Sequence, residues 1–185
     1  MRSDLNWKPE RLDIEAFAKQ GVSLEGHWSA AELERWQASN LGDASQLPIH
    51  WTLRGEVLKP AGAAPQVWLH VHSDTEARLS CQRCLQPAGF ALQIERSFRF
   101  VRDEATALAE DPDSEEDLLV LSRSFDAREL IEDELLLALP IVPMHERCDP
   151  PLPLSVADTV EEVESESARP NPFAVLAKLR KDEKN

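Results

Sequence analysis

The sequence predicts an α+β fold, in which a mainly antiparallel sheet packs against helices. Polar and apolar residues alternate through 48–57, 66–81 and 90–100, as in strands with one buried face. Helical periodicity with capping residues precedes these runs and returns after them. The chain has 185 residues with 42% hydrophobic composition, which suits one main core. We therefore expect a single domain over 1–148.

Two short helices are predicted in the N-terminal part, residues 1–45. The first, in "RLDIEAFAKQG", has a rough apolar face and ends where Gly21 can act as a C-cap. The second, in "SAAELERWQAS", begins with Ser29 and Glu32 at the spacing of a capping box. Trp36 of this second helix is expected to face inward.

The three alternating runs are expected to form neighbouring strands. In the second run, Trp68, His70 and His72 fall on the face opposite to its valines and leucine. The stretch "CQRCLQPAG" then becomes the connection to the third run, with Pro87 and Gly89 as its turn residues.

The second half of the predicted domain is acidic at first and then strongly apolar. We expect 103–117 to be an acidic mobile loop, because it has little apolar content to pack. Residues 117–121 are expected to be a short buried strand or an extended segment. An apolar helix should follow, with Asp126 as its N-cap and Pro140 beyond its end, and it should pack on the sheet. We interpret the carboxylates of 132–134 as part of its solvated face.

The C-terminal part is predicted to be a flexible acidic tail that ends in a short amphipathic helix. Residues 149–170 form an acidic, proline-rich linker with low hydrophobicity. Residues 171–185 have the pattern of an amphipathic helix, and such a segment often binds a groove on a partner. The residues expected to bind that partner are Pro172, Phe173, Leu176 and Leu179.

The charge of the chain limits its partners. The formal net charge is −14, from 20 basic and 34 acidic residues. Nucleic-acid binding depends largely on Lys and Arg, so a chain this acidic suits a basic protein partner better. It contains no apolar run typical of a signal peptide or a transmembrane helix, and only three cysteines. We expect a cytoplasmic protein with reduced thiols and no membrane contact.

The cysteines are the clearest candidate site. Cys81 and Cys84 have the two-residue spacing of a zinc knuckle, and His145 and Cys148 form a second pair. Together they make a complete Cys3His set, which would hold a structural zinc ion if the two pairs meet in space. Two alternatives stay open. Cys81 could be a buried strand residue with Cys84 exposed in the turn, or the two could be a redox couple.

A direct RNA-binding module is an alternative reading of the same chain. Aromatic and histidine side chains on an exposed sheet face, with arginines nearby, could provide stacking and phosphate contacts. The residues of this alternative are Arg54, Trp68, His70, His72, Arg78 and Arg83.

No arrangement in the sequence indicates catalysis. The chain lacks a nucleophile elbow, a glycine-rich phosphate loop and a zinc-protease motif. A zinc-dependent enzyme would also need an open coordination position, which four side-chain ligands would close. We expect no catalytic residues.

Three segments together resemble one bacterial family: "LSCQRCLQP", "IEDELLLALPIVPMHERC" and the ending "RPNPFAVLAKLRK". The chain from about residue 45 onward is similar to the large ribosomal RNA subunit accumulation protein, or YceD, family. The resemblance implies a non-enzymatic, cytoplasmic ribosome biogenesis factor, needed for the accumulation or processing of 23S ribosomal RNA. It brings no metal with it. Because of the charge, we expect this factor to act on 23S rRNA indirectly. Its basic partner would be a ribosomal protein or an rRNA-processing enzyme.

Overall fold

The computed structural model of the chain describes residues 7–148. The predictions for the linker 149–170 and the helix 171–185 lie outside the described residues. In chain order the elements are a 3₁₀ helix (Pro9–Arg11), α1 (Ile14–Gln20), β1 (Ser23–Ser29), a 3₁₀ helix (Ala30–Glu32), α2 (Glu34–Ser39), β2 (Pro48–Leu58), β3 (Gln66–Ser80), β4 (Pro87–Val101), α3 (Glu104–Glu110), a 3₁₀ helix (Asp111–Asp113), β5 (Asp117–Val120) and α4 (Ala127–Leu137).

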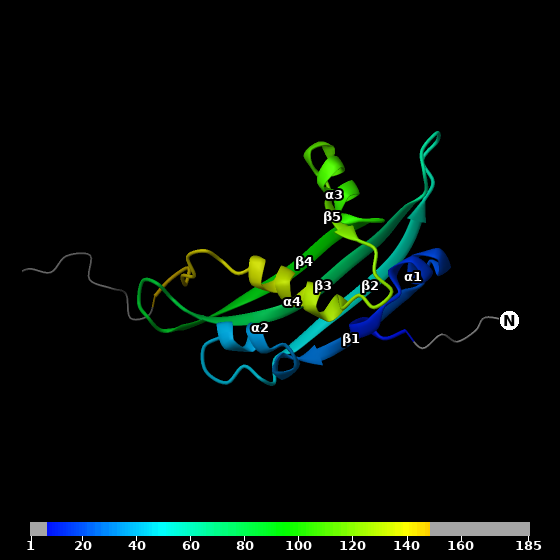
Figure 1. The fold of residues 1–185 in the computed structure, drawn as a ribbon. Coiled ribbons are helices and arrows are strands. Elements are labelled where there is room, and N and C mark those ends of the chain that lie inside the picture. The colour runs from blue at the N-terminus through cyan, green and yellow to red at the C-terminus, as the bar shows by residue number, and fades with distance from the viewer. Residues whose placement is uncertain (1–6, 149–185) are drawn as a thin grey trace, which may run out of the picture. The chain divides into compact units, whose positions relative to one another are not determined.

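The strands form one five-stranded sheet in the order β1-β2-β3-β4-β5 (Figure 1). Neighbours from β1 to β4 are antiparallel, and β5 pairs with β4 in parallel. The prediction of an α+β fold with a mainly antiparallel sheet is therefore confirmed. The β3–β4 hairpin is the longest pairing, with a register that runs from Val67↔Phe100 to Ser80↔Pro87.

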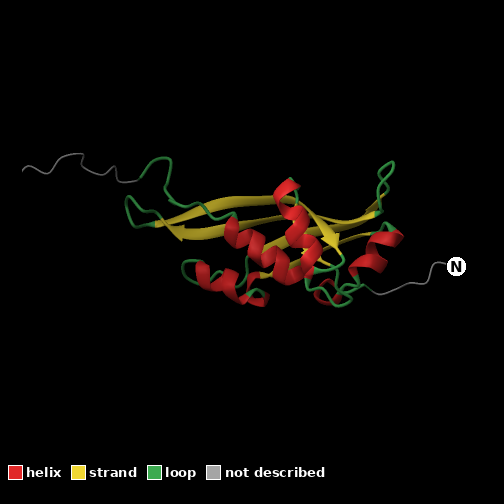
Figure 2. Cartoon of the chain, turned by 45° about the horizontal axis from the view of Figure 1, so that its top comes forward, coloured by secondary structure: helices red, strands yellow, loops and turns green. Residues whose placement is uncertain are grey.

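The helices cover one face of this sheet (Figure 2). The alternation of apolar residues puts one side chain in two on that face, where they pack against α1 and α4. At Gly55 the backbones of β2 and α1 approach so closely that a Cβ would lie 2.7 Å from the Phe17 ring and 2.8 Å from the Ala18 Cα. The fully buried large side chains include Phe17, Trp36, Ile49, Leu53, Leu69, Ile131 and Leu135.

The N-terminal part contains a strand that the sequence reading missed. We expected only helices in residues 1–45, but Ser23–Ser29 forms β1 and pairs with β2 along its length. Its inward positions include Gly26, a residue that weakens strand patterns. The glycine has a packing reason, because a Cβ there would lie 2.6 Å from the Trp51 ring.

The second predicted N-terminal helix is present but broken. The capping box is confirmed: the Ser29 side chain accepts from the Ala31 N–H, and Glu32 accepts from the Ser29 N–H at 2.8 Å. Leu33 then has an extended backbone and separates a 3₁₀ turn from α2. Trp36 faces inward as expected, with no exposed surface.

The expectation that 103–117 is an acidic mobile loop is wrong in that the segment is not a loop, because it contains α3 and a 3₁₀ helix. Asp103 caps α3 by accepting from the Thr106 N–H at 2.8 Å. Alternating alanines in "EATALAE" give α3 high helix propensity in spite of the low apolar content of 103–117 as a whole. Arg99 of β4 ties the segment to the sheet through Glu110 at 2.7 Å and Ser114 at 2.8 Å.

The predicted α4 is confirmed, with Asp126 accepting from two backbone amides at its start. Two of its carboxylates differ from expectation. The Glu134 side chain is only 12% exposed and pairs with Arg96 at 3.3 Å, and Glu132 is buried rather than solvated. Its Oε1 accepts from the Trp36 N–H at 3.0 Å, and its Oε2 pairs with Arg35 at 2.9 Å. Glu132 therefore caps α2 from another helix, because α2 has no side-chain cap of its own.

Candidate metal centre

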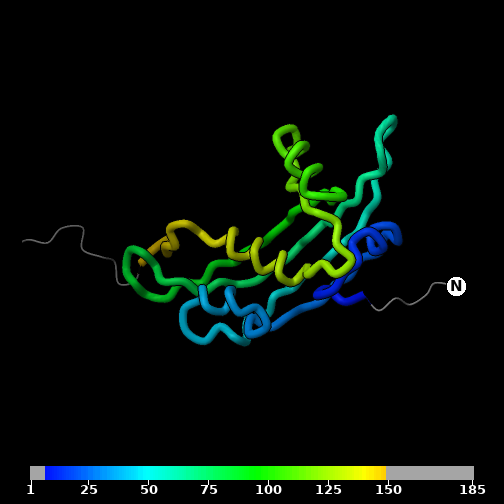
Figure 3. Tube along the Cα trace, viewed as in Figure 1, coloured from blue at the N-terminus to red at the C-terminus, as the bar shows by residue number. Residues whose placement is uncertain are grey.

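Two segments far apart in the sequence meet at one end of the sheet. The tip of the β3–β4 hairpin lies beside the chain that follows α4 (Figures 1 and 3). Cys81 is the first residue after β3, and the Gln82 N–H donates to the Pro143 carbonyl at 2.8 Å. The structure thus brings together the two pairs that the sequence singled out, Cys81 and Cys84 with His145 and Cys148.

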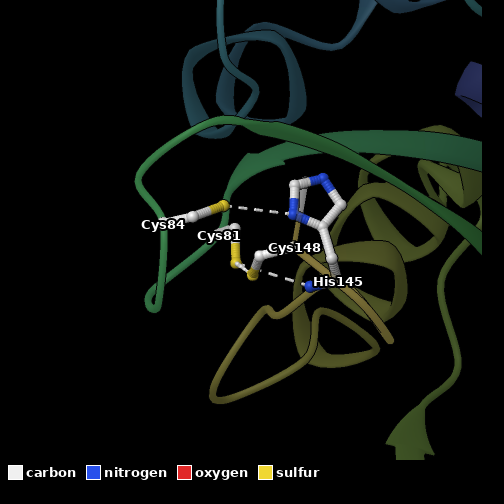
Figure 4. A group of neighbouring side chains, drawn as sticks. All are labelled: Cys81, Cys84, His145 and Cys148. Carbon is white, nitrogen blue, oxygen red and sulfur yellow. Dashed lines mark hydrogen bonds between the residues drawn. The ribbon is translucent and has the colours of Figure 1, made fainter. Parts of the chain in front are cut away.

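The four side chains offer their ligand atoms to one point (Figure 4). The three Sγ atoms and a ring nitrogen of His145 all lie within 4.8 Å of one another. Cys84 Sγ lies 3.4 Å from His145 Nδ1, and Cys81 Sγ lies 4.0 Å from Cys148 Sγ. All three thiols are free. The group could hold a metal ion.

The turn that presents the first pair is tightly bonded. The Cys81 N–H donates to the Gln86 carbonyl at 2.9 Å, and the Leu85 N–H donates to the Cys81 carbonyl at 2.8 Å. Leu85 has a φ of 61°, the one positive value among non-glycine residues in the described part of the chain. A leucine in this conformation is strained, and such strain occurs most often at functional sites.

The turn also corrects the sequence reading of Pro87 and Gly89. We expected them to supply the turn chemistry, but both lie within β4, where Pro87 pairs with Ser80 and Gly89 with Arg78. The turn is made by the residues between and around the cysteines. Pro87 is tolerated because it is the first residue of its strand.

His145 is oriented by contacts of its other ring nitrogen. Nε2 lies 3.0 Å from the Pro87 carbonyl oxygen. A carbonyl only accepts hydrogen bonds, so this contact places the proton on Nε2 and leaves the Nδ1 lone pair directed at the sulfurs. Metal-binding histidines are usually held in this way.

Arg83, between the two cysteines, holds the second pair in place. Its Nε donates to Cys148 Sγ at 3.1 Å, and Nη2 donates to the His145 carbonyl at 2.7 Å. The sequence reading had assigned Arg83 to RNA contacts and missed this role. The position of Arg83 inside the C-x-x-C motif indicated this role, because a side chain between the two cysteines lies close to the groups that they contact.

The thiols are in different electrostatic environments. Burial of Cys81 opposes ionisation, but amide donors of Cys84, His145 and Arg83 outweigh it and lower the Cys81 pKa to about 5. At Cys84 the Gln86 amide favours the thiolate, yet burial and the neighbouring thiols raise the pKa. The contrast therefore has two causes: three amide donors stabilise the Cys81 thiolate, whereas burial and neighbouring sulfurs disfavour the Cys84 thiolate.

The residues of the RNA-binding alternative do not form one group. Arg54, Trp68, His70 and His72 share the sheet face opposite the helices, through the pairs Arg54↔His70 and Glu56↔Trp68. Arg78 lies on the same face further along β3, and Arg83 lies at the Cys3His group beyond the end of β3.

The shared face is not an open basic surface. Trp68 has 8% exposure and stacks on His70. Glu56 binds Arg54 at 2.9 Å and His70 at 3.1 Å. On β1 to β4 this face carries more carboxylates than arginines: Glu25, Glu56, Asp74, Glu76 and Glu95 against Arg54, Arg78 and Arg99.

The expected partner-binding residues Pro172, Phe173, Leu176 and Leu179 lie outside the described residues. Among the helices of residues 7–148, none has the length and apolar composition to span a bilayer.

Fold and site together define the class of protein: a small α+β protein with helices on one face of its sheet and a Cys3His group at the tip of the β3–β4 hairpin. Comparison with known proteins gives the family. The family model described as "Large ribosomal RNA subunit accumulation protein YceD" matches residues 69–180. A Haemophilus influenzae protein with the same name is 32% identical over 181 residues, covering 93% of this chain and 95% of the relative. The chain belongs to the YceD family. No solved structure matches it.

Proposed function

We propose that this chain is a non-enzymatic ribosome biogenesis factor of the cytoplasm, which supports the synthesis, processing or accumulation of 23S ribosomal RNA. The observation that carries the proposal is membership of a family named for large ribosomal RNA subunit accumulation, over nearly the whole chain. The Cys3His group enters as a structural element. Four protein donors leave no open position for a substrate, so a structural zinc ion fits this reading and a catalytic zinc ion does not.

The partner in this proposal is a basic protein, such as a ribosomal protein or an rRNA-processing enzyme. The net charge of −14 supports it. So does the acidic segment around α3, where five carboxylates have no ion-pair partner among residues 7–148: Glu104, Asp111, Asp113, Glu115 and Glu116. Exposed charges of one sign accelerate association with a partner of the opposite sign.

The test of the function is depletion of the protein in cells, followed by measurement of 23S against 16S rRNA. The proposal expects 23S rRNA to fall and the chain supplied from a plasmid to restore it. An unchanged ratio in depleted cells would overturn the role in large-subunit RNA.

The test of the partner is a crosslinking pull-down from growing cells, read for proteins and for rRNA, with and without ribonuclease. A basic protein should be retained after ribonuclease, and it should be lost when 149–185 is deleted. Phe173→Ala combined with Leu176→Ala should weaken capture more than the control Val175→Ala. Tight binding of purified 23S rRNA alone, with a steep salt dependence, would instead favour the direct RNA-binding module.

A further inference from the structure

We propose that Cys81, Cys84, His145 and Cys148 bind one zinc ion, which fixes the segment after α4 to the tip of the β3–β4 hairpin. This inference does not depend on the role in 23S rRNA accumulation. Its starting point is that two ligand pairs, 61 residues apart between Cys84 and His145, converge at one place.

The separations fit tetrahedral coordination. With zinc–sulfur distances of about 2.3 Å and a zinc–nitrogen distance of about 2.0 Å, neighbouring ligand atoms lie about 3.5–3.8 Å apart. The Cys84–His145 pair is at 3.4 Å and the Cys81–Cys148 pair at 4.0 Å. Shifts of less than about 1 Å would therefore complete the geometry.

The donor types select the metal. Thiolate and imidazole ligands favour zinc over magnesium or calcium, which prefer oxygen ligands. No carboxylate belongs to the group that the structure brings together among residues 7–148. Gathered thiolates would repel one another, and a divalent cation between them removes that repulsion.

The surrounding contacts are those of a built site. The His145 N–H donates to Cys81 Sγ at 3.4 Å, and Arg83 donates to Cys148 Sγ at 3.1 Å. Three thiolates, a neutral histidine and Zn²⁺ carry a net charge of −1, which the Arg83 guanidinium offsets. The Pro87 carbonyl holds His145 with Nδ1 directed inward.

The ion has a structural task because little else holds this part of the chain. Residues 138–148 contain no helix or strand. Ala138 and Leu139 still pack against the core, but the large apolar side chains beyond them are exposed: Ile141 is 98% exposed, Val142 55% and Met144 48%. Hydrophobic burial therefore does not fix residues 141–148, which the hydrogen bonds to the hairpin tip hold instead.

The first experiment measures zinc in the full chain, purified under reducing conditions without chelator, by mass spectrometry of the metal. The expected content is about one zinc ion per chain, lost in Cys84→Ser and in His145→Ala. The control is His50→Ala, which removes an exposed histidine on the sheet face opposite the helices. This variant should keep the zinc.

The second experiment keeps the test decisive if a ligand variant does not fold. Co²⁺ added to zinc-depleted wild-type protein should give thiolate-to-cobalt charge-transfer bands and the visible bands of tetrahedral cobalt, which stoichiometric Zn²⁺ removes. Depletion should also open the chain to trypsin after Arg147, and Zn²⁺ should restore protection.

Two results would overturn the zinc site. One is a folded, reduced wild-type chain that neither contains zinc nor develops the cobalt bands. The other is protein isolated with a Cys81–Cys148 disulfide, seen as a mass lower by two hydrogens. A chain that holds zinc but fails to restore 23S rRNA would refute only the proposed function.

Discussion

The contact of Glu132 with α2 gives the sharpest test of how the helices are held together. In Glu132→Ala, the N–H of the fully buried Trp36 loses its acceptor, and α2 loses the carboxylate at its N-terminus. An orphaned buried amide together with a lost cap costs about 2 kcal/mol. At an m-value of about 2 kcal/mol/M, the urea midpoint should fall by about 1 M.

The assay is urea unfolding at pH 7, followed by circular dichroism and tryptophan fluorescence. Glu132→Gln keeps an acceptor for the Trp36 N–H and should lose about half as much stability. Asp133→Ala is the matched control. The Asp133 side chain is half-exposed, and its Oδ1 pairs with Nη1 of Arg35 at 2.5 Å. If Asp133→Ala matches Glu132→Ala, or if Glu132→Ala leaves the midpoint unchanged, the capping argument is wrong.

Three further predictions concern packing, capping and pH. Gly55→Ala should lower the free energy of unfolding by about 2 kcal/mol, because its Cβ would meet the backbone of α1. The control Gly89→Ala faces only the flexible Glu76 side chain and should lower it clearly less in the same urea assay. Ser29→Ala removes the capping-box hydroxyl and should cost about 1 kcal/mol, and no change would contradict the bond to Ala31. Burial raises the pKa of Glu134 in the folded chain, and the charge of Arg96 opposes this shift. As pH rises past about 4.5, Glu134 therefore ionises in the unfolded chain before it does in the folded chain, and its contribution to the free energy of unfolding falls. Glu134→Gln should therefore be more stable than the wild type at pH 7 but not at pH 3, as measured by thermal unfolding, and an equal gain at both would refute it.

The strands were predictable where the alternation was complete. In β2 and β3, hydrophobic residues at every second position left no other reading, and the structure buries Leu53, Leu69 and Val71 as expected. β1 was missed because Gly26 interrupts its alternating pattern. A glycine is required there because the Trp51 ring of the neighbouring strand leaves no room for a Cβ. This requirement comes from tertiary packing, so it cannot be predicted from the sequence of the segment alone.

The candidate metal site was likewise predictable only in part. Spacing alone identified the two ligand pairs, because two-residue intervals are set by the geometry of a single turn. The hairpin was expected, but the meeting of the two pairs was not predictable, because it depends on the path that the chain takes after α4 to reach the hairpin tip. For Arg83, the position inside the C-x-x-C motif indicates a place near the site, but its partners Cys148 and His145 are more than 60 positions away and are identified only by the structure.

The distance between the ligand pairs along the chain has a consequence for synthesis of the protein. Cys81 and Cys84 leave the translating ribosome first, and His145 and Cys148 follow only after α3, β5 and α4 have been made. A nascent chain that stops before this point can offer an ion two sulfurs at most. Only a chain translated through Cys148 contains the complete donor set, and products that end before it lack part of the proposed site.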